Sequence, residues 1–124
     1  MGNIVVIGAG GQLGQCIKKI VGLRAVENVV FPEENTANIL DVPALELLFE
    51  QTSPAYVINC AAYTAVDKAE DEAAIAKAVN ETGARNLAQL CKKHQATLIH
   101  ISTDFVFEGT EVKLLKEDDK AHPI

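Results

Sequence analysis

The sequence predicts a doubly wound α/β fold, in which a parallel sheet carries helices on both faces. An apolar run, Ile4–Ile7, leads directly into a glycine-rich turn at Gly8–Gly14. Further compact apolar runs then alternate with amphipathic stretches along the chain. Apolar residues make up 48% of the chain and tryptophan is absent. Small aliphatic side chains dominate, as is typical of strands buried on both faces.

The glycine turn predicts a nucleotide-binding βαβ unit. Glycine allows a tight turn with positive φ, and it lets a pyrophosphate approach the backbone without meeting a Cβ atom. The N–H groups at the start of the next helix would then face the phosphates. Gly8, Gly11 and Gly14 follow a three-residue spacing, whereas Leu13 stands where G-x-G-x-x-G needs its third glycine. A tight turn without a ligand is the alternative interpretation.

The first half of the chain predicts a helix over 12–21, a strand over 26–31, a short third strand over 38–40 and a second helix after Asp41. The apolar face of the first helix would consist of Leu13, Ile17, Ile20 and Val21. Gly22 would end this helix. Asp41 would cap the second helix, with Pro43 near its start. Its buried side chains would be Leu45, Leu48 and Phe49.

An acidic residue that reads the ribose is expected about 20 residues after the glycines. Glu33 and Glu34 are the acids in that range. Either would favour NADH over NADPH, and a solvated turn explains them equally well. The choice of cofactor therefore stays open.

The second half predicts a strand over 55–60, a long helix over about 72–93 and a strand over 96–101. Gly83 and Ala84 would let the helix approach the sheet closely, and Asn80 and a partly buried His100 would be structural. These elements predict the strand order 3-2-1-4-5. Thr103 follows the last strand, at the sheet edge where α/β folds place their chemistry.

Charge and cysteine usage exclude several classes of protein. The net charge is −6 and no lysine- or arginine-rich run occurs, which argues against a nucleic acid or an acidic membrane as partner. No apolar run is long enough to span a membrane. Cys16, Cys60 and Cys91 are isolated within apolar segments, so we expect buried, reduced thiols and a cytoplasmic protein. No metal-binding spacing is present.

Several segments together resemble the dTDP-4-dehydrorhamnose reductase family, an extended-type branch of the short-chain dehydrogenase/reductase superfamily with a Rossmann-like fold. They are Gly8–Gly14, Asn59–Glu70, Val79–Asn80, Gly83, Asn86–Ala88 and Ser102–Gly109. The runs Ala61–Glu70 and Ser102–Gly109 are specific within the superfamily, whereas the glycine motif is not. The resemblance implies reduction of the C4 keto group of dTDP-4-dehydro-β-L-rhamnose by NADPH or NADH, for surface polysaccharides.

The resemblance also implies roles for individual residues. The cofactor-binding set would be Gly8, Gly11, Gln12, Leu13, Asp41, Val42, Ala62, Tyr63 and Thr64. Within it, Asp41 and Val42 would hold the adenine. Ala62, Tyr63 and Thr64 would line the ribose and nicotinamide side. Thr103 would be the catalytic hydroxyl and contact the substrate, a nucleotide sugar. Asp104 would be a second substrate contact.

The chain departs from the superfamily in one respect. The superfamily's proton donor lies in a Tyr-x-x-x-Lys helix, and neither Tyr56 nor Tyr63 has a lysine four residues on. We therefore expect a cofactor-binding domain over 1–107 and a polar tail over 108–124, truncated before that helix and inactive alone. The apolar run Leu98–Ile101 would be an exposed sheet edge, which predicts self-association through this edge or through the uncovered face of the sheet.

Two other functions remain open at this point. One is a binding role without catalysis, as in the regulatory subunit of methionine adenosyltransferase, which resembles the same family. The other is a nucleotide-sugar epimerase or dehydratase of the same superfamily. The run Val66–Glu70 favours the reductase.

Overall fold

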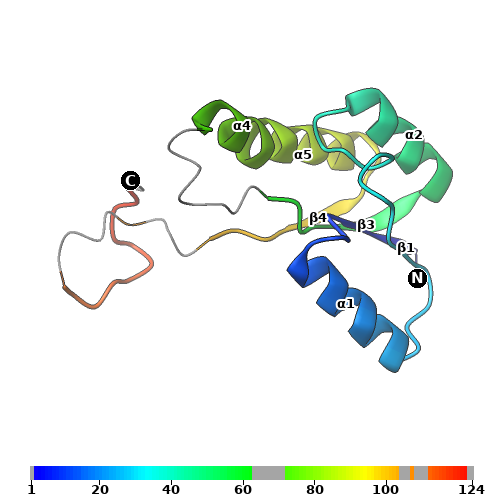
Figure 1. Ribbon diagram of the computed structural model, residues 1–124, viewed down its shortest axis with the longest axis horizontal. Coiled ribbons are helices and arrows are strands. Elements are labelled where there is room, and N and C mark those ends of the chain that lie inside the picture. Colours follow the sequence, from blue (N-terminus) through cyan, green and yellow to red (C-terminus); the bar gives the residue numbers. More distant parts are fainter. Residues whose placement is uncertain (1, 63–71, 104–106, 108–111, 123–124) are drawn as a thin grey trace.

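The computed structural model describes residues 2–62, 72–103, 107 and 112–122. In these residues one parallel sheet has the order β2-β1-β3-β4. The strands are β1 (Asn3–Ile7), β2 (Val29–Val30), β3 (Pro54–Asn59) and β4 (Thr97–His100). Figure 1 shows the sheet between two layers of helices, with α1 (Gln12–Leu23) on one face and α2 (Val42–Thr52) and α5 (Ala84–Lys93) on the other. The prediction of a doubly wound α/β fold is confirmed.

The prediction of a third strand at Asn38–Leu40 was wrong, because this segment forms a turn. The side-chain oxygen of Asn38 accepts the Leu40 N–H at 2.9 Å, and the Asn38 carbonyl accepts the Asp41 N–H at 3.0 Å. Backbone groups that a strand would offer to a neighbour are therefore used locally. Ile39 is buried in the core. The sheet has the predicted order without its outermost strand.

Two predicted boundaries also differ from the structure. The first helix continues through Gly22 to Leu23, with Arg24 as its C-cap. The second strand covers only Val29–Val30. Asn28, with φ of 63°, is in the left-handed region, so the chain cannot be extended from Val26 onward.

The hydrophobic core lies between the sheet and helices α2 and α5. Its buried members are Val5, Ile7, Ala37, Ile39, Leu45, Leu48, Phe49, Val57, Leu87, Leu90 and Cys91. The three predicted core residues of α2 are among them. Val6 is fully buried, and because strand residues alternate it faces the α1 side.

The predicted long helix is present as three consecutive helical segments. They are α4 (Ala73–Lys77), a π-helical turn η1 (Ala78–Gly83) and α5. Gly83 allows a close approach, as predicted, but to Ile39 in the turn before α2 and not to the sheet: a Cβ atom at Gly83 would overlap the Ile39 side chain. Ile75 in α4 is 52% exposed, whereas Leu87, Leu90 and Cys91 in α5 are buried.

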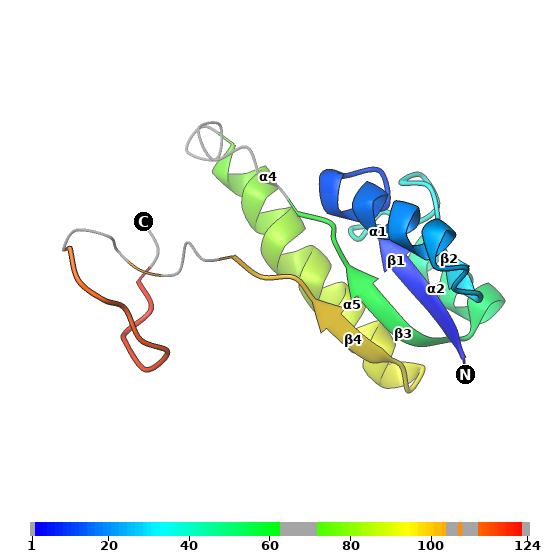
Figure 2. The ribbon, with the colours of Figure 1, turned by 90° about the horizontal axis from the view of Figure 1, so that it is seen from below.

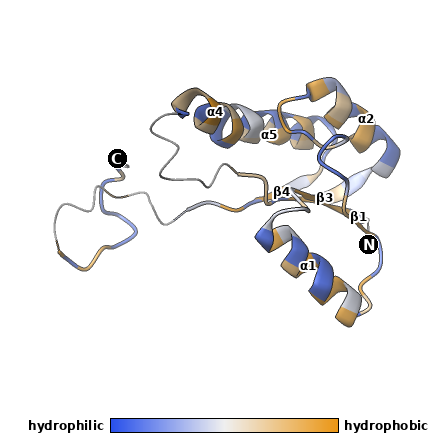
Figure 3. Cartoon of the chain, in the orientation of Figure 1, coloured by the Kyte–Doolittle hydropathy of each residue, from blue (hydrophilic) through white to orange (hydrophobic). Residues whose placement is uncertain are grey.

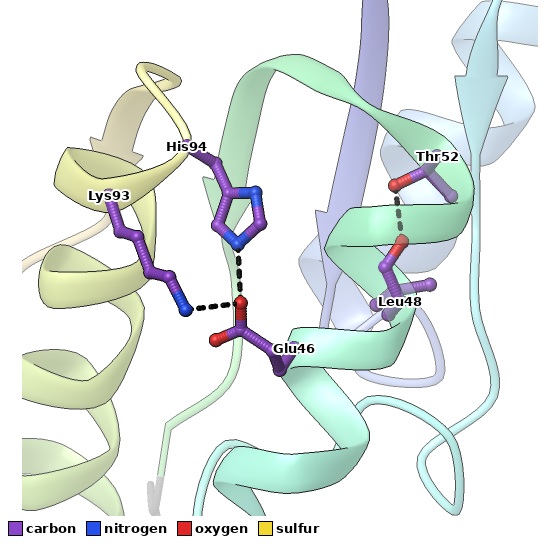
Figure 4. A network of polar contacts seen from close by, with 5 residues as sticks. All are labelled: Glu46, Leu48, Thr52, Lys93 and His94. Carbon is purple, nitrogen blue, oxygen red and sulfur yellow. Dashed lines mark hydrogen bonds and ion pairs between the residues drawn. The ribbon is translucent and has the colours of Figure 1, made fainter.

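A polar cluster joins α2 to the end of α5 (Figure 4). The Glu46 carboxylate accepts hydrogen bonds from Lys93 Nζ and His94 Nε2, both at 2.8 Å. These two hydrogen bonds hold the pKa of Glu46 below its ordinary value of 4.5, and the bond from Lys93 has the larger effect. The His94 ring also packs edge-on against Phe49, with 5.4 Å between the ring centroids. The cluster therefore fixes the helix pair on this face.

The face covered by α1 is less well buried. Figure 2 shows α1 lying over β1 while β3 and β4 are left uncovered on this side. Hydrophilic and hydrophobic residues alternate along α1 (Figure 3), and on its predicted apolar face Leu13 is 43% and Ile20 55% exposed. Cys16 is likewise exposed, so the expectation that all the cysteines are buried was wrong.

The predicted apolar edge is present, because β4 is an edge strand and Ile99 is exposed.

Residues 112–122 contain no helix or strand, and their one ordered turn joins Lys116 to Asp119. The Asp119 side chain accepts the Lys116 N–H at 2.8 Å. No helix in the described part of the chain is both long and apolar enough to cross a membrane.

Candidate functional site

A pocket of about 730 Å³ opens at the carboxyl ends of β1, β2 and β3. Its wall is formed by Gly8–Gly11, Lys18, Phe31–Glu34, Ala37–Ile39, Cys60–Ala62 and Val79. The strands are parallel, so the loops after all three strands meet at this edge. The size and mixed lining are those of a small-molecule or cofactor site.

Gly8 and Gly14 are required by the backbone of the turn itself. Gly8 has φ of +76°, and a Cβ atom there would lie 2.5 Å from the Ala61 N atom. A Cβ at Gly14 would overlap the Gly8 carbonyl oxygen. The same oxygen accepts the Gly11 N–H at 3.1 Å, which closes the turn. Gly8 therefore packs the turn against the loop after β3, and Gly14 packs the start of α1 against the turn.

Gly10 and Gly11 have a different role, because a Cβ atom at either would overlap nothing: at Gly11 it would lie 3.4 Å from the Gly8 carbonyl oxygen. A Cβ atom at Gly10 would meet no atom within 4 Å. Gly11 is the N-cap of α1, and no side chain in the described ranges caps this helix. The N–H groups of its first turn are thus available to an anion. Gln15 Nε2 donates to the Gly10 carbonyl at 2.7 Å and steadies the turn. This arrangement fits the pyrophosphate of a dinucleotide.

The opposite wall is held in place by Asn59, which is 1% exposed. Its Oδ1 accepts the Ala61 N–H at 3.0 Å, and its Nδ2 lies 3.1 Å from His100 Nδ1 on β4. His100 is exposed, contrary to the expectation of partial burial. Through these hydrogen bonds, Asn59 turns the chain at the end of β3 and positions the segment Cys60–Ala62. Partial burial of Cys60 raises the pKa of its thiol.

The far end of the pocket carries its charged groups. Glu33 and Glu34 line it, at the distance from the glycines that the sequence predicted. Lys18 also lines it, and sequence reasoning missed this residue. Its Nζ lies 5.9 Å from the centroid of the Phe31 ring. The sequence did carry a signal for this residue, because Lys18 comes four residues after Gly14 and therefore lies on the same face of the helix.

The other predicted cofactor residues lie around the pocket rather than in its wall. Gln12 and Leu13 begin α1 and are exposed. Asp41 caps α2 as predicted, with its Oδ1 accepting the Ala44 N–H at 3.1 Å. Asp41 and Val42 are absent from the described pocket wall, in which Asn38 and Ile39 take part.

The predicted residues on the substrate side are described only in part. Ala62 lines the pocket. Tyr63, Thr64 and Asp104 lie outside the described residues. Thr103 is exposed and follows β4, whose carboxyl end is at the same edge of the sheet. Within the described ranges, no three His, Cys, Asp or Glu side chains come together as a metal site.

Comparison with known proteins gives one consistent family. The model of the RmlD substrate binding domain matches residues 2–124. The dTDP-4-dehydrorhamnose reductase of Aggregatibacter actinomycetemcomitans is 34% identical over 124 residues, covering 100% of this chain and 42% of the relative. That of Streptomyces griseus is 40% identical over 119 residues, covering 96% of this chain and 39% of the relative.

Solved structures agree with these relatives. The dTDP-4-dehydrorhamnose reductase of Bacillus anthracis, in complex with NADP, has a TM-score of 0.89 and 30% identity, covering 99% of this chain and 44% of that one. The reductase of Clostridium acetobutylicum has a TM-score of 0.88 and 36% identity, covering 98% of this chain and 43% of that one.

The chain spans about two fifths of the length of these relatives. The family model, in contrast, matches it almost from end to end. Its fold agrees with that of these structural neighbours. This chain belongs to the RmlD substrate binding domain family.

Proposed function

We propose that this chain is the cofactor-binding part of a dTDP-4-dehydrorhamnose reductase, which reduces dTDP-4-dehydro-β-L-rhamnose to dTDP-L-rhamnose with NADPH or NADH. The observation that carries the proposal is the pocket lined by Gly10 and Gly11 at the start of α1, which has no side-chain cap among the described residues. The reductases of the same family support it, one of them solved with NADP. Residues 1–107 would form the cofactor domain, and 108–124 would be a polar tail leading to the rest of the enzyme.

Different residues along the pocket would bind the cofactor and the substrate. The bound cofactor supplies the hydride. The N–H groups after Gly11 bind its phosphates, and the small side chains of Ala61 and Ala62 let it lie against the backbone after β3. The Thr103 hydroxyl donates a hydrogen bond to the keto oxygen as negative charge develops there. Asp104 contacts the sugar.

The proton for the new hydroxyl would have to come from elsewhere. A tyrosine with a lysine four residues later is the superfamily's donor, and here Cys60 and Asp67 stand four residues after Tyr56 and Tyr63. Without the donor and the remaining substrate contacts, the reacting groups are not held in position. We therefore expect the 124-residue chain to bind cofactor without turning over substrate.

Calorimetric titration with NADPH and NADH tests the proposal. We expect saturable binding that Gly11→Val abolishes, because the valine side chain would occupy space at the phosphate end. Gly22→Ala is the matched control: it lies on the same helix, and a Cβ there meets nothing within 4 Å. Circular dichroism checks that each variant is folded. Absence of binding to the folded wild-type chain would contradict the proposal.

Self-association through β4 is a second part of the proposal, with another copy of this chain as partner. Ile99 and Ile101 are 44% and 42% exposed at the sheet edge, and Tyr56 on the neighbouring strand β3, opposite Thr97, is 40% exposed. An apolar edge strand offers unpaired backbone groups to another strand. We also propose a cytoplasmic location, which the three free cysteines favour.

A further inference from the structure

The charged end of the pocket has a feature that hydride transfer does not require. Lys18 projects from the middle of α1, and its ammonium is held 5.9 Å from the centroid of the Phe31 ring. Phe31 is the first residue after β2. This cation–π contact joins the helix to the end of the second strand and fixes a positive charge on the pocket wall.

The charge of Lys18 is not neutralised by the acids beside it. Ion pairs in the described part of the chain involve Glu46 and Glu81, and none includes Lys18. Glu33 and Glu34 line the same pocket but are exposed, so their side chains can turn towards water. Lys18 therefore remains available to an anion in the pocket.

We propose that Lys18 binds the 2′-phosphate of NADPH and makes this chain prefer NADPH to NADH. The inference rests on the proposed function. When a pyrophosphate lies on the glycine turn, the adenosine ribose lies near the end of the second strand, which is where Lys18 and Phe31 meet. A phosphomonoester carries about −1.5 to −2 charges, and the lysine ammonium offers three donors to its oxygens.

The neighbouring carboxylates sharpen this inference. An acid beside the ribose accepts a hydrogen bond from a free 2′-hydroxyl and repels a 2′-phosphate. Glu33 and Glu34 thus favour NADH, and Lys18 opposes them. Removing the lysine charge should therefore weaken NADPH binding so far that the chain binds NADH more tightly than NADPH.

The test is calorimetric titration of the 124-residue chain with NADPH, NADH, 2′,5′-ADP and 5′-AMP. We expect Lys18→Gln to raise the Kd for NADPH and 2′,5′-ADP about tenfold or more, as for loss of one charge-assisted hydrogen bond. The Kd for NADH and 5′-AMP should change less than about twofold. Lys18→Arg should restore most of the NADPH affinity. Lys19→Gln is the matched control, because Lys19 is exposed and outside the described pocket wall.

The outcomes separate this inference from the proposed function. If both dinucleotides bind but Lys18→Gln leaves their ratio unchanged, the inference is wrong and the proposed function stands. The same holds if Lys19→Gln has an equal effect, because the 2′-phosphate would then sense only the general field of the helix. If neither dinucleotide binds the folded wild-type chain, the proposed function fails and the inference fails with it.

Discussion

Substitution of Gly8 tests how the glycine turn is built. Gly8 has φ of +76°, and an alanine held at this φ would carry backbone strain of about 1–3 kcal/mol. The new Cβ would also lie 2.5 Å from the Ala61 N atom, and relieving such an overlap in packed backbone costs about 1–3 kcal/mol more. We therefore expect Gly8→Ala to lower the free energy of unfolding by about 2–6 kcal/mol, a large part of what a small domain has.

Urea unfolding followed by circular dichroism measures this change. With an m-value of about 2 kcal/mol/M, the midpoint should fall by about 1 M or more. Gly22→Ala, inside α1, is the control: its Cβ meets no neighbour, and the change should stabilise by about 0.5–1 kcal/mol. Gly10→Ala should change stability by less than about 0.5 kcal/mol. A Gly8→Ala midpoint equal to that of the wild type would refute the reasoning.

Three further predictions concern other parts of the fold. Asp41→Ala removes the cap of α2 and should cost about 1 kcal/mol in the same urea assay, whereas Asp41→Asn should cost less. The pKa of Glu46 is lowered in the folded state, so its contribution is present above pH 4.5 and is lost as the pH falls through the folded pKa. Wild type and Glu46→Gln should therefore converge in stability in acid, and a constant difference would contradict this. Ile99→Lys should reduce self-association in sedimentation velocity runs, and a wild type that is monomeric at high concentration would contradict the edge proposal.

Local patterns in the sequence were enough to predict the buried face of α2 and its N-cap. Asp41 precedes Pro43 and an apolar spacing of Leu45, Leu48 and Phe49, so the cap and the buried face could be predicted from residues close in sequence. The glycine turn was predictable for the same reason. The order of the four observed strands followed from the alternation of apolar runs.

Features that depend on a competing side-chain hydrogen bond or on distant neighbours were not predictable in this way. Asn38 directs its side chain to the Leu40 N–H and turns an apolar triplet away from the sheet. Leu13 and Ile20 have helical spacing, but their burial depends on what covers the α1 face. Lys18 gains its place in the pocket because α1 approaches the end of β2, and this approach is visible only in three dimensions.

The central claim is that a dinucleotide lies against the glycine turn. Amide chemical shifts of the 15N-labelled chain, recorded during titration with NADPH, test it most directly. We predict saturable shifts centred on Gly10, Gly11, Ala61 and Ala62, with little change at the far end of α2. Shifts confined to other surfaces of the molecule, or none in a folded sample, would contradict the claim.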